Sequence, residues 1–151
     1  MRIFVDADSC PCDVRDYILE KALRLNVNVI YAANKVIPFS RESSLFAMQL
    51  CPEGKDSADL WILNAACESD IVVTRDIPFA KRLVEKNITA INDRGTLFSK
   101  ENVEYLLKER DLSMQMAALG LHKGVKFGSY GKKEFSAFVK CFNEVLEKKL
   151  N

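Results

Sequence analysis

The feature that most constrains the fold is a short apolar segment near the start of the chain that runs directly into two carboxylates. Ile3, Phe4 and Val5 form a continuous apolar run, which is typical of a central strand buried on both faces. Asp6 and Asp8 follow where this strand should end. Open α/β sheets bind ligands outside the carboxyl ends of their strands, so acids at this point favour a Mg²⁺ or Mn²⁺ site. The alternative is structural, with Asp8 as a helix N-cap and Asp6 bonded to turn amides.

Alternating helix and strand patterns follow this first strand. Residues 12–25 carry apolar side chains at helical spacing, and residues 27–33 have the composition of a second buried strand. This order predicts a right-handed crossover and a parallel sheet. Further strands are predicted at 71–74 and 88–91, with a weaker candidate at 45–50, and further helices at 79–85, 101–108, 113–119 and 134–150. We therefore expect an α/β fold of three layers, with a mainly parallel central sheet flanked by helices, in a single domain over residues 1–151.

Composition is consistent with one globular domain. Hydrophobic residues make up 48% of the 151 residues and charged residues 28%, which is ordinary for such a domain. A net charge of +1 gives no overall attraction to nucleic acid or membrane, so any basic surface must be local. No apolar stretch has the length of a signal-peptide core or a transmembrane helix, so we expect a cytoplasmic protein without a membrane partner.

The cysteines indicate reduced thiols. Five cysteines in a chain without an export signal favour a reducing compartment. Cys10 and Cys12 suggest a zinc site, but zinc sites usually need a wider spacing and a second pair of ligands, and His122 is the only histidine. Buried or partly exposed thiols are therefore expected.

Acidic residues also occur near the other predicted strands. Asp76 follows the strand at 71–74, and Asp59 lies in the first turn of a helix that opens at Asp56. Asp56 as N-cap with Asp59 three residues later is an acidic variant of a capping box, although Asp59 could also point into a cleft. Because parallel strands end at one edge of a sheet, the acids expected to gather there are Asp6, Asp8, Asp59 and Asp76. Such a cluster repels itself unless a cation neutralises it, and two-metal phosphodiesterases use one to activate water.

Candidate phosphate contacts come from arginines and from a basic segment. The arginines are Arg41, Arg75 and Arg94, whose guanidinium groups pair well with phosphate oxygens. Residues 120–133 contain glycines, aromatic residues and several lysines, among them Lys123 and Lys126, without one acid. Basic loops of this kind suit nucleic-acid backbones and stacked bases, whereas the alternative is a solvated linker to the last helix. No P-loop, dinucleotide fingerprint or nucleophile elbow is present.

Four motifs resemble a known family. They are Asp6-Ala7-Asp8-Ser9-Cys10-Pro11, Asp56-Ser57-Ala58-Asp59, Val73-Thr74-Arg75-Asp76-Ile77-Pro78 and Asn92-Asp93-Arg94-Gly95. In order and spacing they resemble the YaiI/YqxD family of uncharacterised bacterial proteins from the N-terminus to about Asp111. The basic loop and the Phe-rich last helix are more loosely similar, with Lys123-Gly124-Val125 where the family tends to have Gly-Gly-Pro.

The resemblance carries expectations for fold and site. The family is grouped with PIN-like nucleases, which implies a parallel α/β sheet with an acidic metal cleft. By the same resemblance, Asp6, Asp59 and Asp76 stand at the positions of PIN-type metal ligands, and Asp8 is a fourth acid. It implies a nuclease fold without establishing activity, because fold does not determine function.

The leading hypothesis is a Mg²⁺- or Mn²⁺-dependent nuclease that acts on RNA, or on DNA flaps as a second choice. The four acids would hold the metal and serve catalysis, while the arginines and the loop lysines would position phosphates. One alternative is a non-catalytic RNA-binding or regulatory module with the same fold. Another is a haloacid-dehalogenase-type phosphatase, with Asp6 as covalent nucleophile, Asp8 as acid/base and Thr74 as the later hydroxyl residue.

Overall fold

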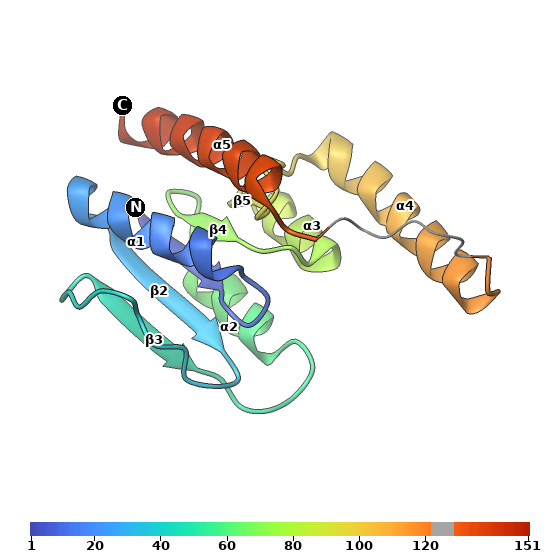
Figure 1. Cartoon of the computed structure of the whole chain (residues 1–151), viewed down its shortest axis with the longest axis horizontal. Helices are drawn as coiled ribbons and strands as arrows, with labels where there is room; N and C mark the ends of the chain where they lie inside the picture. Colours follow the sequence, from blue (N-terminus) through green and yellow to red (C-terminus); the bar gives the residue numbers. More distant parts are fainter. Residues whose placement is uncertain (122–128) are drawn as a thin grey trace.

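The structure, a computed structural model, describes residues 1–121 and 129–151. At its centre is a five-stranded sheet in the order β3-β2-β1-β4-β5, in which every neighbouring pair is parallel. The strands are β1 (Arg2–Asp6), β2 (Asn28–Ala33), β3 (Phe46–Leu50), β4 (Ile71–Val73) and β5 (Thr89–Ile91) (Figure 1). The predicted α/β fold is confirmed, and the weaker strand candidate at 45–50 forms the edge strand β3.

The central position of β1 follows from its apolar side chains, which suit burial on both faces of a sheet. Ile3, Phe4 and Val5 are fully buried. Val5 is in register with Tyr31 of β2 and with Val73 of β4. The three strands therefore run side by side to a common edge, and the acidic segments that follow β1 and β4 are neighbours.

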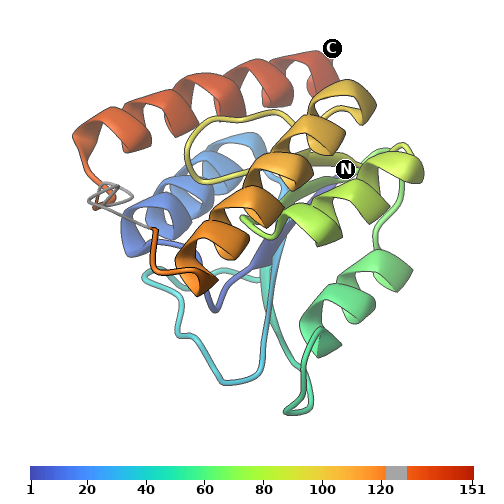
Figure 2. The ribbon, with the colours of Figure 1, turned by 90° about the vertical axis from the view of Figure 1, so that its right-hand side faces the viewer.

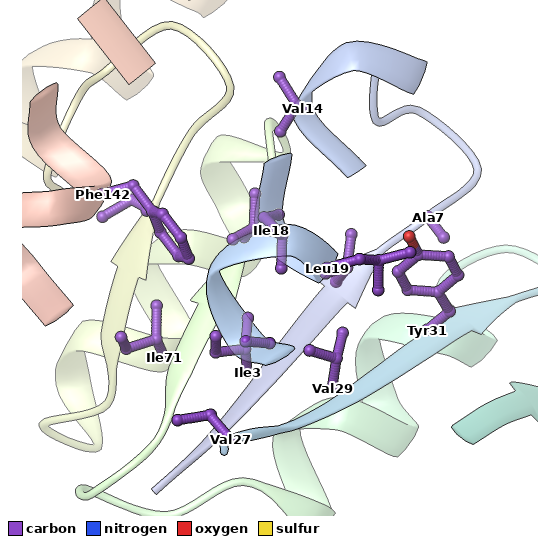
Figure 3. Packing of buried hydrophobic residues seen from close by; sticks show 14 of the residues in the cluster. Ile3, Ala7, Val14, Ile18, Leu19, Val27, Val29, Tyr31, Ile71 and Phe142 are labelled. Atoms are coloured by element: carbon purple, nitrogen blue, oxygen red, sulfur yellow. The ribbon is translucent and has the colours of Figure 1, made fainter. Parts of the chain in front are cut away.

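Helices cover both faces of the sheet. On one face, α1 (Cys12–Leu25) and α5 (Lys132–Leu150) contribute side chains such as Ile18 and Phe142 to a core cluster with the strands (Figure 3). On the other face lie α2 (Ser57–Ala65), α3 (Ile77–Glu85) and α4 (Lys100–Ala118) (Figure 2). These helices contribute Ile62, Leu83 and Val103 to a second cluster. Within the described residues, no helix is both long enough and apolar enough to span a membrane.

Local sequence determines the bounds of α1. The helix covers residues 12–25, as predicted, and ends at Asn26, which adopts the left-handed conformation with φ of 56°. The backbone N–H of Asn26 donates to the carbonyl of Ala22. A C-terminal asparagine of this kind can adopt the left-handed conformation that ends many helices.

The prediction of two helices at 101–108 and 113–119 is wrong, because a single helix, α4, covers both segments. Residues 109–112 contain neither glycine nor proline, so nothing in the backbone interrupts the helix. The start of α4 is stabilised by Ser99, whose Oγ accepts from the Asn102 N–H at 3.1 Å while Asn102 Oδ1 accepts from the Ser99 N–H at 2.8 Å. This reciprocal pair is a capping box.

The predicted basic loop at 120–133 is described only in part. Lys123 and Lys126, the candidate phosphate contacts of this loop, lie outside the described residues. The helix predicted at 134–150 is present as α5, which begins slightly earlier, at Lys132.

Candidate metal centre

The acidic segments lie where the strand order reverses. The chain places β2 and then β3 on one side of β1, and later places β4 and β5 on its other side. The segments that leave β1 and β4 therefore diverge, which is the point at which open α/β sheets bind ligands. Asp6 is the last residue of β1, and Asp76 comes shortly after β4.

Three carboxylates come together at this edge. One side-chain oxygen from each of Asp56, Asp59 and Asp76 lies within 4.8 Å of the other two. Asp56 and Asp59 lie at the start of α2, and Asp76 lies at the start of α3. Asp59 is only 9% exposed, Asp76 is half-buried and Asp56 is exposed. We refer to these three residues as the acidic triad.

The surroundings of Asp59 disfavour its negative charge. Burial raises the pKa of Asp59 to about 7, and the neighbouring charges of Asp6, Asp76 and Asp56 act in the same direction. A hydrogen bond with Asp76 also raises this pKa. Asp59 thus exchanges its proton near neutral pH, whereas a cation beside it would favour the ionised form.

Asp6 belongs to the same electrostatic cluster, although it is outside the acidic triad. Its Oδ2 accepts a hydrogen bond from Thr74 Oγ1 at 3.0 Å. Burial raises the pKa of Asp6, the Thr74 hydrogen bond opposes this, and the charges of Asp76 and Asp8 raise it further. The structural alternative predicted that backbone amides of the turn would donate hydrogen bonds to Asp6. In the structure the donor is instead the side-chain hydroxyl of Thr74, which directly follows β4.

The capping roles of two acids are the reverse of those predicted. Asp56 occupies the N-cap position of α2, as predicted, but it has φ of 66° and its side chain makes no hydrogen bond to the helix, so the predicted capping box with Asp59 is wrong. Asp76, which was expected only as a site acid, caps α3, because the Phe79 N–H donates to its Oδ1 at 3.0 Å. The left-handed backbone at Asp56 departs from the extended conformation that an N-cap aspartate normally adopts.

Asp8 connects the turn after β1 to the loop after β2. Its Oδ2 accepts from the Asn34 N–H at 3.1 Å, and the N-cap of α1 is Pro11. The structural alternative that made Asp8 a helix N-cap is therefore wrong. Asp8 is exposed and is not one of the three acids whose oxygens lie within 4.8 Å of one another. Its role as a metal ligand remains a prediction.

The candidate phosphate-binding arginines differ in their partners. Arg75 forms an ion pair with Asp93, whose side chain is 4% exposed, while 47% of the Arg75 side chain is exposed. Arg94 lies 3.9 Å from Glu134 and stacks over the Tyr130 ring. Arg41 is exposed in the loop between β2 and β3, on the other side of β1 from Arg75 and Arg94. The structure thus does not gather the predicted arginines into one cluster.

A small recess lies beside Asp6. It has a volume of about 10 Å³ and is lined by Asp6, Ser9, Cys10, Thr74, Arg75 and others. This volume is about that of one water-sized probe.

All five cysteines of the chain are free thiols, in agreement with the prediction of reduced cysteines. Burial raises the pKa of Cys10 to about 12, so its thiol is protonated at neutral pH.

Sequence reasoning missed two members of this region. Asp56 was assigned a capping role, yet it contributes an oxygen to the acidic triad. Thr74 was considered only for the phosphatase alternative, yet its hydroxyl donates to Asp6 and accepts from the Asp76 N–H at 3.1 Å. The spacing of Asp56 and Asp59, three residues apart at the start of α2, was the signal for the first. The position of Thr74 directly after an apolar strand was the signal for the second.

The donor set of the triad suits a hard divalent cation. All three side chains offer carboxylate oxygens, the ligands preferred by Mg²⁺ and Mn²⁺. Burial and the neighbouring acids disfavour the ionised form of Asp59, and a cation beside it would favour that form again. The residues present therefore fit a hard divalent metal ion.

Comparisons with known proteins agree with the family resemblance. The model described as "Uncharacterized BCR, YaiI/YqxD family" matches residues 4–148. The chain is 39% identical over 150 residues to a UPF0178 protein of Treponema denticola, covering 99% of this chain and 94% of that protein. A UPF0178 protein of Psychromonas ingrahamii is 35% identical over 148 residues, covering 98% and 97%. No solved structure gives a significant match. The chain therefore belongs to the YaiI/YqxD family.

Proposed function

We propose that this protein is a metal-dependent nuclease of the PIN-like type that hydrolyses phosphodiester bonds, with RNA as the favoured substrate. The observation that carries the proposal is the meeting of Asp56, Asp59 and Asp76 oxygens within 4.8 Å at the reversal point of the sheet. Carboxylates this close together repel one another when they are ionised, and a bound cation would remove this repulsion.

In this proposal the triad holds Mg²⁺ or Mn²⁺, and Asp6 and Asp8 complete the acidic edge. The bound metal would supply Lewis acidity to the phosphate and lower the pKa of an attacking water. Asp59, whose pKa without metal is raised to about 7, would hold the cation as the ionised carboxylate. Thr74 orients Asp6 by donating to its Oδ2 at 3.0 Å, which leaves Oδ1 for the site.

The proposed substrate contacts are cationic groups around this edge. Arg75 has a half-exposed guanidinium group that is held by Asp93, so its position is restrained while its outer face remains accessible. Arg94, Arg41 and the lysines at 123 and 126 are further proposed contacts to phosphates. RNA is preferred as the substrate on the basis of the basic, aromatic-containing segment at 120–133.

The test combines metal binding with cleavage. Mn²⁺ is titrated by calorimetry into the wild type, Asp59→Asn and Asp6→Asn, and a labelled single-stranded RNA is incubated with the same preparations. We expect the wild type to bind Mn²⁺ and cleave RNA, and both variants to lose cleavage. Asp59→Asn should also lose at least tenfold in Mn²⁺ affinity, because it removes the buried ligand of the triad.

The matched control is Asp111→Asn, which changes an exposed acid on α4 and should behave as the wild type. Thermal unfolding of each variant shows whether the fold is retained. Cleavage that persists undiminished in a clean Asp6→Asn preparation would contradict the proposal. RNA binding that survives chelation, without cleavage at any metal concentration, would instead favour the non-catalytic module.

A further inference from the structure

A second, larger cavity lies beside the acidic edge and shares only Asp8 with the function proposed above. It has a volume of about 560 Å³, within the range of pockets that hold small molecules. Its walls come from the turn after β1, the first turns of α1 and the loop that follows β2. Its lining includes Asp8, Arg15, Lys35, Val36, Ile37 and Pro38.

One wall of this cavity is apolar. Val36, Ile37 and Pro38 are consecutive on the loop, and Val36 is 67% exposed although it is aliphatic. Phe39 continues the wall and lies against the Tyr31 ring, with ring centroids 4.5 Å apart. The wall is therefore supported by the core, and it offers an apolar surface to a planar group.

The other side of the cavity carries two cationic side chains, Arg15 and Lys35, and one hydrogen-bond donor of Arg15 has no acceptor among the described residues. Arg15 Nε is buried and has no hydrogen-bond partner among the described residues. A buried donor without an acceptor is destabilising, so a ligand oxygen that accepts from Arg15 would bind favourably. Lys35 is exposed at the same cavity and supplies a second cation.

The acids of the cavity have partners of their own. Asp8 accepts from the Asn34 N–H at 3.1 Å, and Asp16 lies 3.8 Å from the Cys12 thiol, which donates to it. The first turn of α1 has no side-chain cap at Pro11, and helix N-termini favour anions. Asp8 and Asp16 balance the charges of Arg15 and Lys35 in the lining, so a phosphate is favoured only locally, beside the guanidinium group of Arg15 and the first turn of α1.

The cavity is connected to the acidic triad through one residue. Asn34 donates its N–H to Asp8, which lines the cavity, and its Oδ1 accepts from Ser57 Oγ at 3.0 Å. Ser57 directly follows Asp56 of the triad. A chain bound along this edge would therefore pass from the triad to the cavity.

We propose that this cavity binds one nucleotide of a single-stranded nucleic acid next to the bond to be cleaved. The base lies against the apolar wall at 36–38, and its phosphate contacts Arg15 and Lys35. The assignment to a cleaved substrate rests on the proposed nuclease function. A base that is paired and stacked in a duplex cannot enter a cavity of this kind, so the substrate is single-stranded at this position.

The proposal is tested without metal, so that the triad takes no part. Uridine 5′-monophosphate and ribose 5-phosphate are titrated to millimolar concentration into the ¹⁵N-labelled protein in EDTA, and amide shifts are followed by NMR. We expect the nucleotide to shift amides of residues 8–16 and 34–38 and to bind several-fold more tightly than ribose 5-phosphate, because the apolar wall contacts the base. Lys35→Ala and Arg15→Gln should each weaken nucleotide binding about tenfold, since each removes a charged contact.

Lys140→Ala is the matched control, because it removes an exposed lysine of α5 and should leave nucleotide binding unchanged. Nucleotide binding that Lys35→Ala and Arg15→Gln leave intact, or shifts confined to other residues, would overturn the proposed pocket, whatever the cleavage result. If the pocket binds as expected while no preparation binds metal or cleaves RNA, the nuclease proposal fails and the nucleotide pocket stands.

Discussion

Thr74 donates a hydrogen bond from its Oγ1 to Asp6 Oδ2 at 3.0 Å and so connects the carboxyl ends of the central strand β1 and its neighbour β4. The same hydroxyl oxygen accepts from the Asp76 N–H at 3.1 Å. One side chain therefore orients both Asp6 and the segment that carries Asp76. Residues of this kind determine how precisely a cluster of acids is arranged.

Replacing Thr74 by valine should raise the pKa of Asp6, because the hydrogen bond that favours the ionised carboxylate is lost. The Asp76 N–H would also lose its acceptor, at a cost of about 1–3 kcal/mol in the free energy of unfolding. The pKa is measured by ¹³C NMR titration of the Asp6 carboxyl group. Thr74→Ser retains the hydroxyl and should restore the pKa of Asp6, and an unchanged pKa in Thr74→Val would contradict the assigned hydrogen bond.

Asp59 should make the metal-free protein less stable as pH rises. The unfolded carboxyl group loses its proton near pH 4, whereas the folded one keeps it until about pH 7. Between these values the folded state binds more protons, so the free energy of unfolding falls with rising pH, by at most about 1.4 kcal/mol per pH unit. Urea unfolding in EDTA at pH 5 and pH 8 should show this loss in the wild type.

Asp59→Asn should reduce the same pH dependence, because asparagine has no proton to lose. Its stability relative to the wild type should therefore be higher at pH 8 than at pH 5. Asp111→Asn, which changes an exposed acid on α4, should retain the wild-type dependence. An equal slope in Asp59→Asn and the wild type would show that Asp59 does not carry the effect.

Asp70 should be one of the most sensitive polar positions of the fold. Its side chain is 1% exposed and accepts from the Arg2 backbone N–H at 2.8 Å and from Arg2 Nη2 at 2.7 Å. Burial alone would raise the pKa of Asp70, but hydrogen bonds from Arg2 and Cys67 outweigh it and lower this pKa. Asp70→Ala should lower the free energy of unfolding by about 2–3 kcal/mol, because several partly buried donors of Arg2 and Cys67 lose their buried acceptor.

The control for Asp70→Ala is Glu20→Ala, which removes an exposed ion pair with Arg24. Such a pair contributes about 0.3–0.5 kcal/mol. Chemical denaturation of both variants gives the comparison. Similar decreases in the free energy of unfolding in the two variants would mean that the burial of Asp70 does not strengthen its hydrogen bonds and ion pair with Arg2.

Gly95 should not tolerate alanine. Its φ is +84°, and an added Cβ would lie 2.4 Å from the Ala137 carbonyl oxygen of α5. Gly120 also has a positive φ, of +70°, but an added Cβ would meet nothing within 4 Å. Gly95→Ala should therefore lower the melting temperature clearly more than Gly120→Ala. In Gly120→Ala the only expected cost is about 1 kcal/mol, because alanine is placed in a left-handed backbone conformation. Equal decreases in melting temperature would show that α5 can move away from the methyl group added at position 95 without loss of stability.

Local sequence patterns were enough to predict most elements. The bounds of α1 and the apolar strands β1, β2 and β4 follow from short-range periodicity and from turn-forming residues, so they could be found without knowing the fold. The same logic failed at residues 109–112, where no strong breaker exists and a break between two helices was still assumed. The general position of the acids, at the carboxyl ends of parallel strands, also followed from the order of elements.

What the sequence alone determined is therefore which segments are strands and helices and that acids follow them. Only the tertiary structure decided which acids meet, because the distances between Asp56, Asp59 and Asp76 depend on how two helix starts from distant segments are placed by the sheet order. It also decided that Asp76 caps a helix while Asp56 does not, since capping depends on backbone angles that residue type constrains only weakly. Proximity between distant segments is a property of the packed fold, and no local pattern encodes it.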